Sequence, residues 1–268
     1  MPDAVAAQAT VAAQNVTSSG VKRGFYIGAA VFLILVSLAG FGPSIVDQSK
    51  RNALPTMLVA AHGLITAGWL LLFLTQTILV RTRRVSLHRR VGRIAPIAAL
   101  AMVAVGFVTV VEMSRRGYDL SGDLSRIGAR PGAPLQTREE LAIGMFAPLL
   151  AFANFGILIA GGLWFRHRPD IHKRLMLLAM MSLSAPPIIH MCGFLVAHWP
   201  GFYSVLVPLS FSGVVLLFTG AVIDKLSSGR IHPISIWGPI LFIAETSLLI
   251  AVVTSSAGWH RLARWLVG

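Results

Sequence analysis

Charged residues are scarce in this sequence. They make up 12% of the 268 residues, whereas a soluble domain carries about 25%. Acids are the scarcer sign, with 10 Asp and Glu against 23 Lys and Arg. Together with 55% hydrophobic residues and a mean hydropathy of +0.74, this composition excludes an ordinary soluble domain.

Cysteine is almost missing, and Cys192 is the single example. One thiol excludes an internal disulfide and a thiolate metal cluster. Lysine is absent from the long apolar runs, which excludes the buried Schiff base that a retinal protein needs. The sequence also lacks a phosphate-binding glycine loop, an HExxH motif and a nucleophile elbow. Histidines and rare buried acids are therefore the candidates for chemistry.

Long apolar runs are what the sequence has in plenty. A spanning helix needs about 20 mostly apolar residues, and suitable runs lie at 25–45, 55–80, 94–111, 141–165, 175–197, 202–223 and 234–257. The sequence therefore predicts an all-α fold, a polytopic membrane bundle of about seven transmembrane helices. Residues 1–22 are predicted to be a disordered tail, 23–258 the transmembrane domain, and 259–268 an interfacial tail.

The net charge of +13 comes from short basic clusters between the apolar runs. Lys and Arg concentrate on the cytoplasmic side of membrane proteins. Most of the 23 lie in cytoplasmic segments when the N-terminus is inside and the C-terminus outside. This placement explains the charge without nucleic acid and predicts a lipid bilayer as the partner.

Two histidines, His62 and His190, lie inside apolar runs. Each is about seven residues from the predicted outer end of its span, roughly 10 Å deep at 1.5 Å per residue. Pro186 and Pro187 predict a kink one turn before His190, because proline cannot donate to the preceding turn. Two histidines at one depth on different helices are what a bis-histidine haem or a metal needs. Ordinary interhelical hydrogen bonding is the alternative.

Glu245 is the one acid deep inside a predicted span. With no cation expected at that depth, it is protonated, hydrogen-bonded to a neutral group, or facing water or a ligand. It is therefore the candidate catalytic or proton-handling residue. Asn154 and Gln76 are weaker candidates, which interhelical hydrogen bonds explain. The remaining histidines lie at predicted span boundaries, where an interfacial role suffices: His88, His167, His172, His198, His232 and His260.

Four segments carry a resemblance: AHGLITAGWLLLFLTQTILV, LHRRVGR, HKRLMLLA and GRIHPISIWG. With them the chain resembles a family of bacterial multi-spanning membrane proteins with no established reaction, which implies the bacterial inner membrane as its location. A looser likeness is to transmembrane diheme cytochrome b reductases. It implies one haem between His62 and His190 and a second between His88 and His172. His172 and His190 are separated by about 27 Å of helix, so the second pair falls at the headgroups, and one haem or none fits better.

The leading hypothesis is a redox protein in which His62 and His190 are ligands of haem b or a comparable metal centre. Glu245 would then handle protons, with a quinone as a candidate partner. A proton-coupled transporter or channel built on Glu245 is the rival. The third alternative is an accessory subunit of a homo-oligomer or larger membrane complex.

Overall fold

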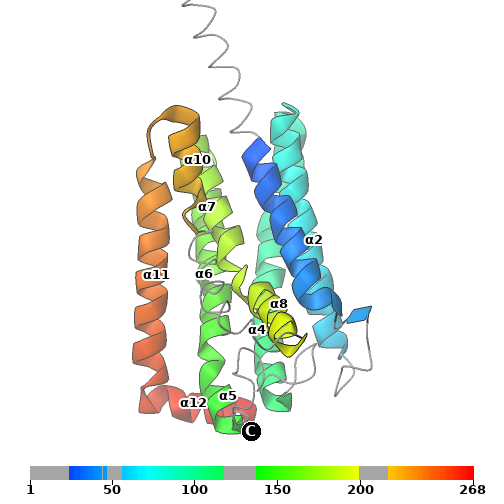
Figure 1. The fold of residues 1–268 in the computed structure, drawn as a ribbon, viewed down its shortest axis with the longest axis vertical. Coiled ribbons are helices and arrows are strands. Elements are labelled where there is room, and N and C mark those ends of the chain that lie inside the picture. The colour runs from blue at the N-terminus through cyan, green and yellow to red at the C-terminus, as the bar shows by residue number, and fades with distance from the viewer. Residues whose placement is uncertain (1–23, 44, 47–55, 118–136, 199–216) are drawn as a thin grey trace, which may run out of the picture.

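The computed structural model describes residues 24–43, 45–46, 56–117, 137–198 and 217–268, and every regular element in them is helical. After a first helix, Gly24–Pro43, the elements are α2 (Met57–Arg81), α3 (Val85–Gly92), α4 (Ala95–Arg116), α5 (Arg138–Gly144), α6 (Phe146–Trp164), α7 (Pro169–Ser182), α8 (Ala185–His198), α10 (Thr219–Ser228), α11 (Pro233–Thr254) and α12 (Ala257–Val267). Figure 1 shows the long helices side by side in an elongated bundle.

Six described stretches are long and apolar enough to cross a membrane: Gly24–Pro43, Met57–Arg81, Ala95–Arg116, Arg138–Trp164, Pro169–Cys192 and Pro233–Thr254. They confirm the prediction of an all-α, multi-pass membrane bundle. The predicted span at 202–223 lies largely outside the described residues, and its last residues begin α10.

Local sequence sets several helix ends. Thr56 lies before α2, and its hydroxyl accepts from the backbone N–H of Val59 at 3.3 Å. Such a cap satisfies a donor that the first turn cannot pair. Gly117 ends α4 in the left-handed region, with φ of 68°, where a side chain is disfavoured. Helix α4 thus extends past the predicted span end at residue 111, and Glu112 lies in the helix rather than in a loop.

The central core lies between α2, α6 and α7. Trp69 of α2 donates its indole N–H to the sulfur of Met180 at 3.0 Å. Its ring also packs edge-on against Phe155 of α6, with centroids 5.2 Å apart. All three side chains are buried. Packing of large apolar groups at this interface fixes which faces of α2, α6 and α7 meet.

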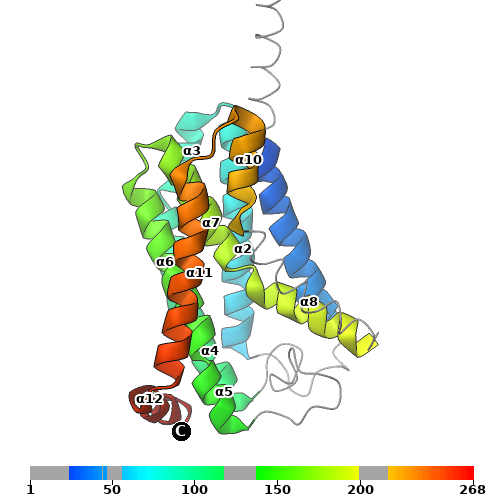
Figure 2. The same cartoon turned by 60° about the vertical axis from the view of Figure 1, so that its left-hand side comes forward.

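The predicted kink before His190 is a complete break between α7 and α8. Pro186 and Pro187 lie in the first turn of α8, where a missing amide donor costs least. The break sends α8 across the first helix (Figure 2). There the backbone of Gly40 is so close that a Cβ would lie 2.3 Å from the carbonyl oxygen of Pro187.

The two ends of the bundle differ. One end carries α3 and α10, and the other carries α5 and α12 (Figures 1 and 2). The predicted interfacial tail forms the amphipathic helix α12. Its Trp259 donates to the carbonyl of Ile143 at 2.9 Å. Arg115 donates to the carbonyl of Leu266 at 2.6 Å, which places a cation at the negative C-terminal end of α12.

Candidate functional site

Two histidines meet at the end of the bundle that carries α3. His88 of α3 and His172 of α7 have ring centroids 6.5 Å apart, with ring planes at 80°. Both side chains are half-buried. The structure brings the two rings together although α3 and α7 are far apart in the chain. A haem at this pair was disfavoured from the sequence because the pair falls at the headgroups, and His172 lies in the first turn of the candidate span Pro169–Cys192.

The Nδ1 atom of each ring is held by a neighbour. Nδ1 of His172 lies 2.7 Å from the carbonyl oxygen of Gly162; since a carbonyl only accepts, this nitrogen carries a proton. Nδ1 of His88 lies 2.5 Å from the side-chain amide nitrogen of Gln76, which donates to it in the orientation in which the amide oxygen accepts from the backbone N–H of Gly92 at 2.8 Å. Metal-ligating histidines commonly donate their other ring N–H to an outer partner, which orients the ring and leaves Nε2 for the metal. His172 has such an outer hydrogen bond, whereas Nδ1 of His88 accepts.

The surroundings of His88 favour its neutral form. Burial lowers the pKa of this imidazole, and the nearby His172 and Arg89 lower it further, while Gln76 acts in the opposite sense. A ligating imidazole must be deprotonated at the ligating nitrogen. Burial, with His172 and Arg89, therefore keeps His88 neutral to a lower pH than an exposed histidine.

His62 lies elsewhere, at the contact of α2 with α6. Its ring packs edge-on against Phe152, with centroids 5.7 Å apart. Its Nδ1 is buried with no hydrogen-bond partner in the described structure, and so is the hydroxyl of Thr66, one turn further along α2. His62 thus lacks the outer hydrogen bond that His172 has.

His190 lies against the first helix, with its ring centroid 4.7 Å from that of Phe41. Nearby Val36, Ile188 and Cys192 form a small buried cluster between the first helix and α8. His62 and His190 therefore have different aromatic neighbours on different helices. Their sharing of one haem or metal stays a prediction.

Glu245 lies in a polar cluster midway along α11. Its Oε2 accepts from the side-chain amide of Asn154 at 3.0 Å and from the hydroxyl of Thr246 at 3.2 Å. The same amide lies 3.2 Å from the Thr246 hydroxyl. Asn154 is buried, at 7% exposure. The structure thus shows Glu245 hydrogen-bonded to neutral groups, which is one of the alternatives expected from the sequence.

A second buried polar network joins α7, α10 and α11, and sequence reasoning missed it. The guanidinium of Arg174 donates to both carboxylate oxygens of Asp224, and its Nε also donates to the hydroxyl of Ser235 at 3.0 Å. Burial raises the pKa of Asp224, but hydrogen bonds from Arg174, Ser235 and the backbone N–H of His232 outweigh it and leave the pKa below its usual value. The sequence feature that could have indicated this network is Asp224, an acid that lies near basic residues directly after a predicted span.

No family model matches the chain, and comparisons with curated proteins and with solved structures find no significant similarity.

A metal ion and a haem need different numbers of ligands from the protein. In the described residues no group of three or more His, Cys, Asp or Glu side chains has an arrangement that could hold a metal ion. Haem needs only two axial ligands from the protein, because the porphyrin supplies the others. His88 and His172 would supply two such ligands, because their rings lie close together, with centroids 6.5 Å apart.

Proposed function

We propose that this integral membrane protein binds haem b and transfers electrons, with His88 and His172 as the axial pair at the end carrying α3. The observation that carries the proposal is their 6.5 Å ring separation. The hydrogen bond from His172 to Gly162 supports it, because it holds one ring with Nε2 left for a ligand.

The surrounding residues suit the charge of the cofactor. Haem carries carboxylates, and α3 presents Arg89 and Arg90 in its last turn. Arginine forms charge-assisted hydrogen bonds with carboxylates. When bound, haem supplies one-electron redox chemistry, while the protein positions it and sets its surroundings. His62 and His190, the outer pair predicted from the sequence, stay the alternative ligands of a single haem.

An absorption spectrum tests the proposal. We expect protein produced with ample haem to show a Soret band that shifts and sharpens on reduction with dithionite. His88→Ala and His172→Ala should each lose at least part of that band, whereas His167→Ala should keep it, because His167 is exposed in the adjacent turn.

Size-exclusion profiles and helical circular dichroism of each variant separate loss of haem from loss of fold. His62→Ala and His190→Ala test the outer pair in the same way. A featureless spectrum from the folded wild-type chain, after supply of haem, would sink the redox proposal.

Proton transfer through Glu245 is the second candidate, and the contact between Glu245 and Asn154 favours it. In the described part of the chain this carboxylate has neutral partners and no salt bridge. An intramembrane carboxylate held by neutral donors can exchange a proton without separating a buried ion pair.

Proteoliposomes loaded with a pH-sensitive dye test this candidate under a potassium diffusion potential. We expect proton entry above that of empty liposomes, with loss in Glu245→Gln and retention in Glu139→Gln, which changes an exposed acid at the bundle end. Entry no faster than in empty liposomes would exclude the proton role.

A further inference from the structure

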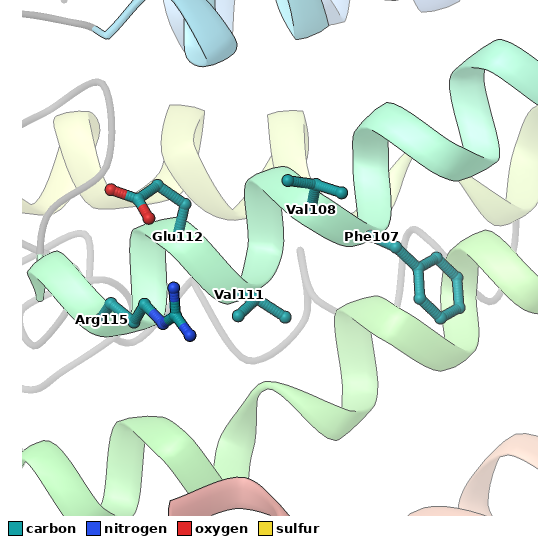
Figure 3. A pocket seen from close by; sticks show the side chains of 5 residues that line it. All are labelled: Phe107, Val108, Val111, Glu112 and Arg115. Carbon is teal, nitrogen blue, oxygen red and sulfur yellow. The ribbon is translucent and has the colours of Figure 1, made fainter. Parts of the chain in front are cut away.

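A hollow of about 230 Å³ lies on α4 where that helix ends, lined by Phe107, Val108, Val111, Glu112 and Arg115. In Figure 3 the two charged side chains lie at one end of the lining and Phe107 lies at the other. Val108 is 57% exposed, so this face of α4 is open to its surroundings. The histidines and Glu245 take no part in it.

The charged end of the hollow holds one group of each sign. Glu112 and Arg115 make no salt bridge among the described residues. The Nε of Arg115 donates to the carbonyl of Leu266 in α12, which holds the guanidinium in place. Its two terminal nitrogens have no hydrogen bond in the described structure. A held cation and a carboxylate therefore line the same end of the hollow, and neither has an ionic partner among the described residues.

The charged end of the hollow lies at the end of a span and its apolar end lies toward the middle of the span, as headgroups and acyl chains do in a bilayer. Glu112 and Arg115 lie in the last turns of a candidate span, Ala95–Arg116. Phe107 lies about 12 Å from Arg115 along the helix axis, toward the middle of the span, at 1.5 Å per residue. The amphipathic helix α12 lies beside the polar end and exposes Trp265 at 74%, as suits a helix at the headgroup level.

We propose that this hollow binds a phospholipid whose headgroup carries both a phosphate and a primary ammonium group, as in phosphatidylethanolamine. Arg115 donates to the phosphate, Glu112 accepts from the ammonium N–H groups, and an acyl chain lies along Phe107 and Val108. A headgroup with a net negative charge meets repulsion from Glu112. A quaternary ammonium offers Glu112 no N–H donor. This site is separate from the proposed haem and proton sites and does not depend on them.

Native mass spectrometry of the purified full-length chain tests the proposal. The protein is incubated in turn with phosphatidylethanolamine, phosphatidylcholine and phosphatidylglycerol of identical acyl chains. We expect phosphatidylethanolamine to be retained roughly three- to tenfold more than either of the others, as a charge-assisted hydrogen bond at a partly exposed site implies.

Three variants assign the preference to the hollow. Glu112→Gln should lower retention of phosphatidylethanolamine to the level of phosphatidylcholine, and Arg115→Gln should lower retention of all three lipids. Arg261→Gln, which removes an exposed cation from α12 at the same end, should change nothing. Val108→Trp fills the hollow without altering charge and should lower retention of all three lipids in a protein of unchanged helicity.

Equal retention of the three lipids by the wild type would overturn the proposal, and so would a preference for phosphatidylglycerol. Unchanged selectivity in Glu112→Gln would place the ethanolamine preference elsewhere on the protein.

Discussion

At the scale of single residues, hydrogen-bond partners distinguish the histidines better than depth does. His172 and His88 each have a neighbour at Nδ1, whereas Nδ1 of His62 is buried without one in the described structure. An unpaired buried polar group costs free energy and usually has a functional or structural cause. The sequence gives the positions of these histidines in the chain, but their hydrogen-bond partners could not be predicted from it.

The pKa of His88 leads to a prediction about acid stability. Its pKa is lowered in the folded protein by burial, by His172 and by Arg89, and an unfolded histidine titrates near about 6.5. Above the unfolded pKa, His88 is neutral in both the folded and the unfolded protein. As the pH falls below the unfolded pKa, the unfolded chain takes up a proton on His88 first. The free energy of unfolding therefore decreases until the pH has passed the lower, folded pKa.

Thermal unfolding in detergent at pH 7.5 and at pH 5.5 measures this loss. His88→Gln should show a smaller decrease in Tm between the two pH values than the wild type. His167→Gln, an exposed control at the same end, should match the wild type. An identical acid-induced decrease in His88→Gln and the wild type would show that other groups cause it.

At the scale of helices, close backbone packing sets where α8 lies. Gly40→Ala would place a Cβ 2.3 Å from the Pro187 carbonyl oxygen, and backbone cannot move aside cheaply. We expect a loss of about 1–3 kcal/mol in the free energy of unfolding, as for other overpacked sites. The measurement is unfolding in mixed micelles by circular dichroism. Gly28→Ala on the same helix is the control, because a Cβ there meets nothing within 4 Å.

Helix-scale features divide into those that the sequence predicts and those that it does not. Run length predicts the long apolar helices, and Pro186 with Pro187 predicts a kink before His190, which the structure shows as the break before α8. The sequence predicts only a basic cluster where α3 lies and an interfacial tail where α12 lies, since the few apolar residues of these short helices resemble ordinary boundary residues. Their apolar faces find partners only in the folded chain, as Trp259 does against Ile143.

Helix pairing in the bundle could not be predicted from the sequence. When a span is apolar on all sides, its sequence does not show which face is buried. The hydrophobic pattern therefore could not predict that His88 meets His172. The same holds for Arg174 with Asp224, 50 residues apart in the chain. The contact between the two histidine rings is therefore known only from the folded structure.

At the scale of the whole molecule, charge asymmetry should orient the bundle. The end with α3 carries the densest basic cluster, and α12 lies at the opposite end (Figure 2). Positive residues stay on the cytoplasmic side during insertion. The prediction is therefore that α3 lies in the cytoplasm and α12 on the other side, with the N-terminus inside.

Cysteine labelling measures this orientation. Replacing the single, buried Cys192 by Ala gives a parent chain with no thiol, into which Ser86→Cys on α3 or Arg261→Cys on α12 is introduced; both sites are exposed. A membrane-impermeant maleimide should label Ser86→Cys only in inside-out vesicles and Arg261→Cys only in right-side-out ones. The reverse pattern would contradict the orientation. Labelling of both variants from one side would contradict the placement of α3 and α12 on opposite faces of the membrane, because the hydrocarbon layer of about 30 Å separates the two aqueous phases.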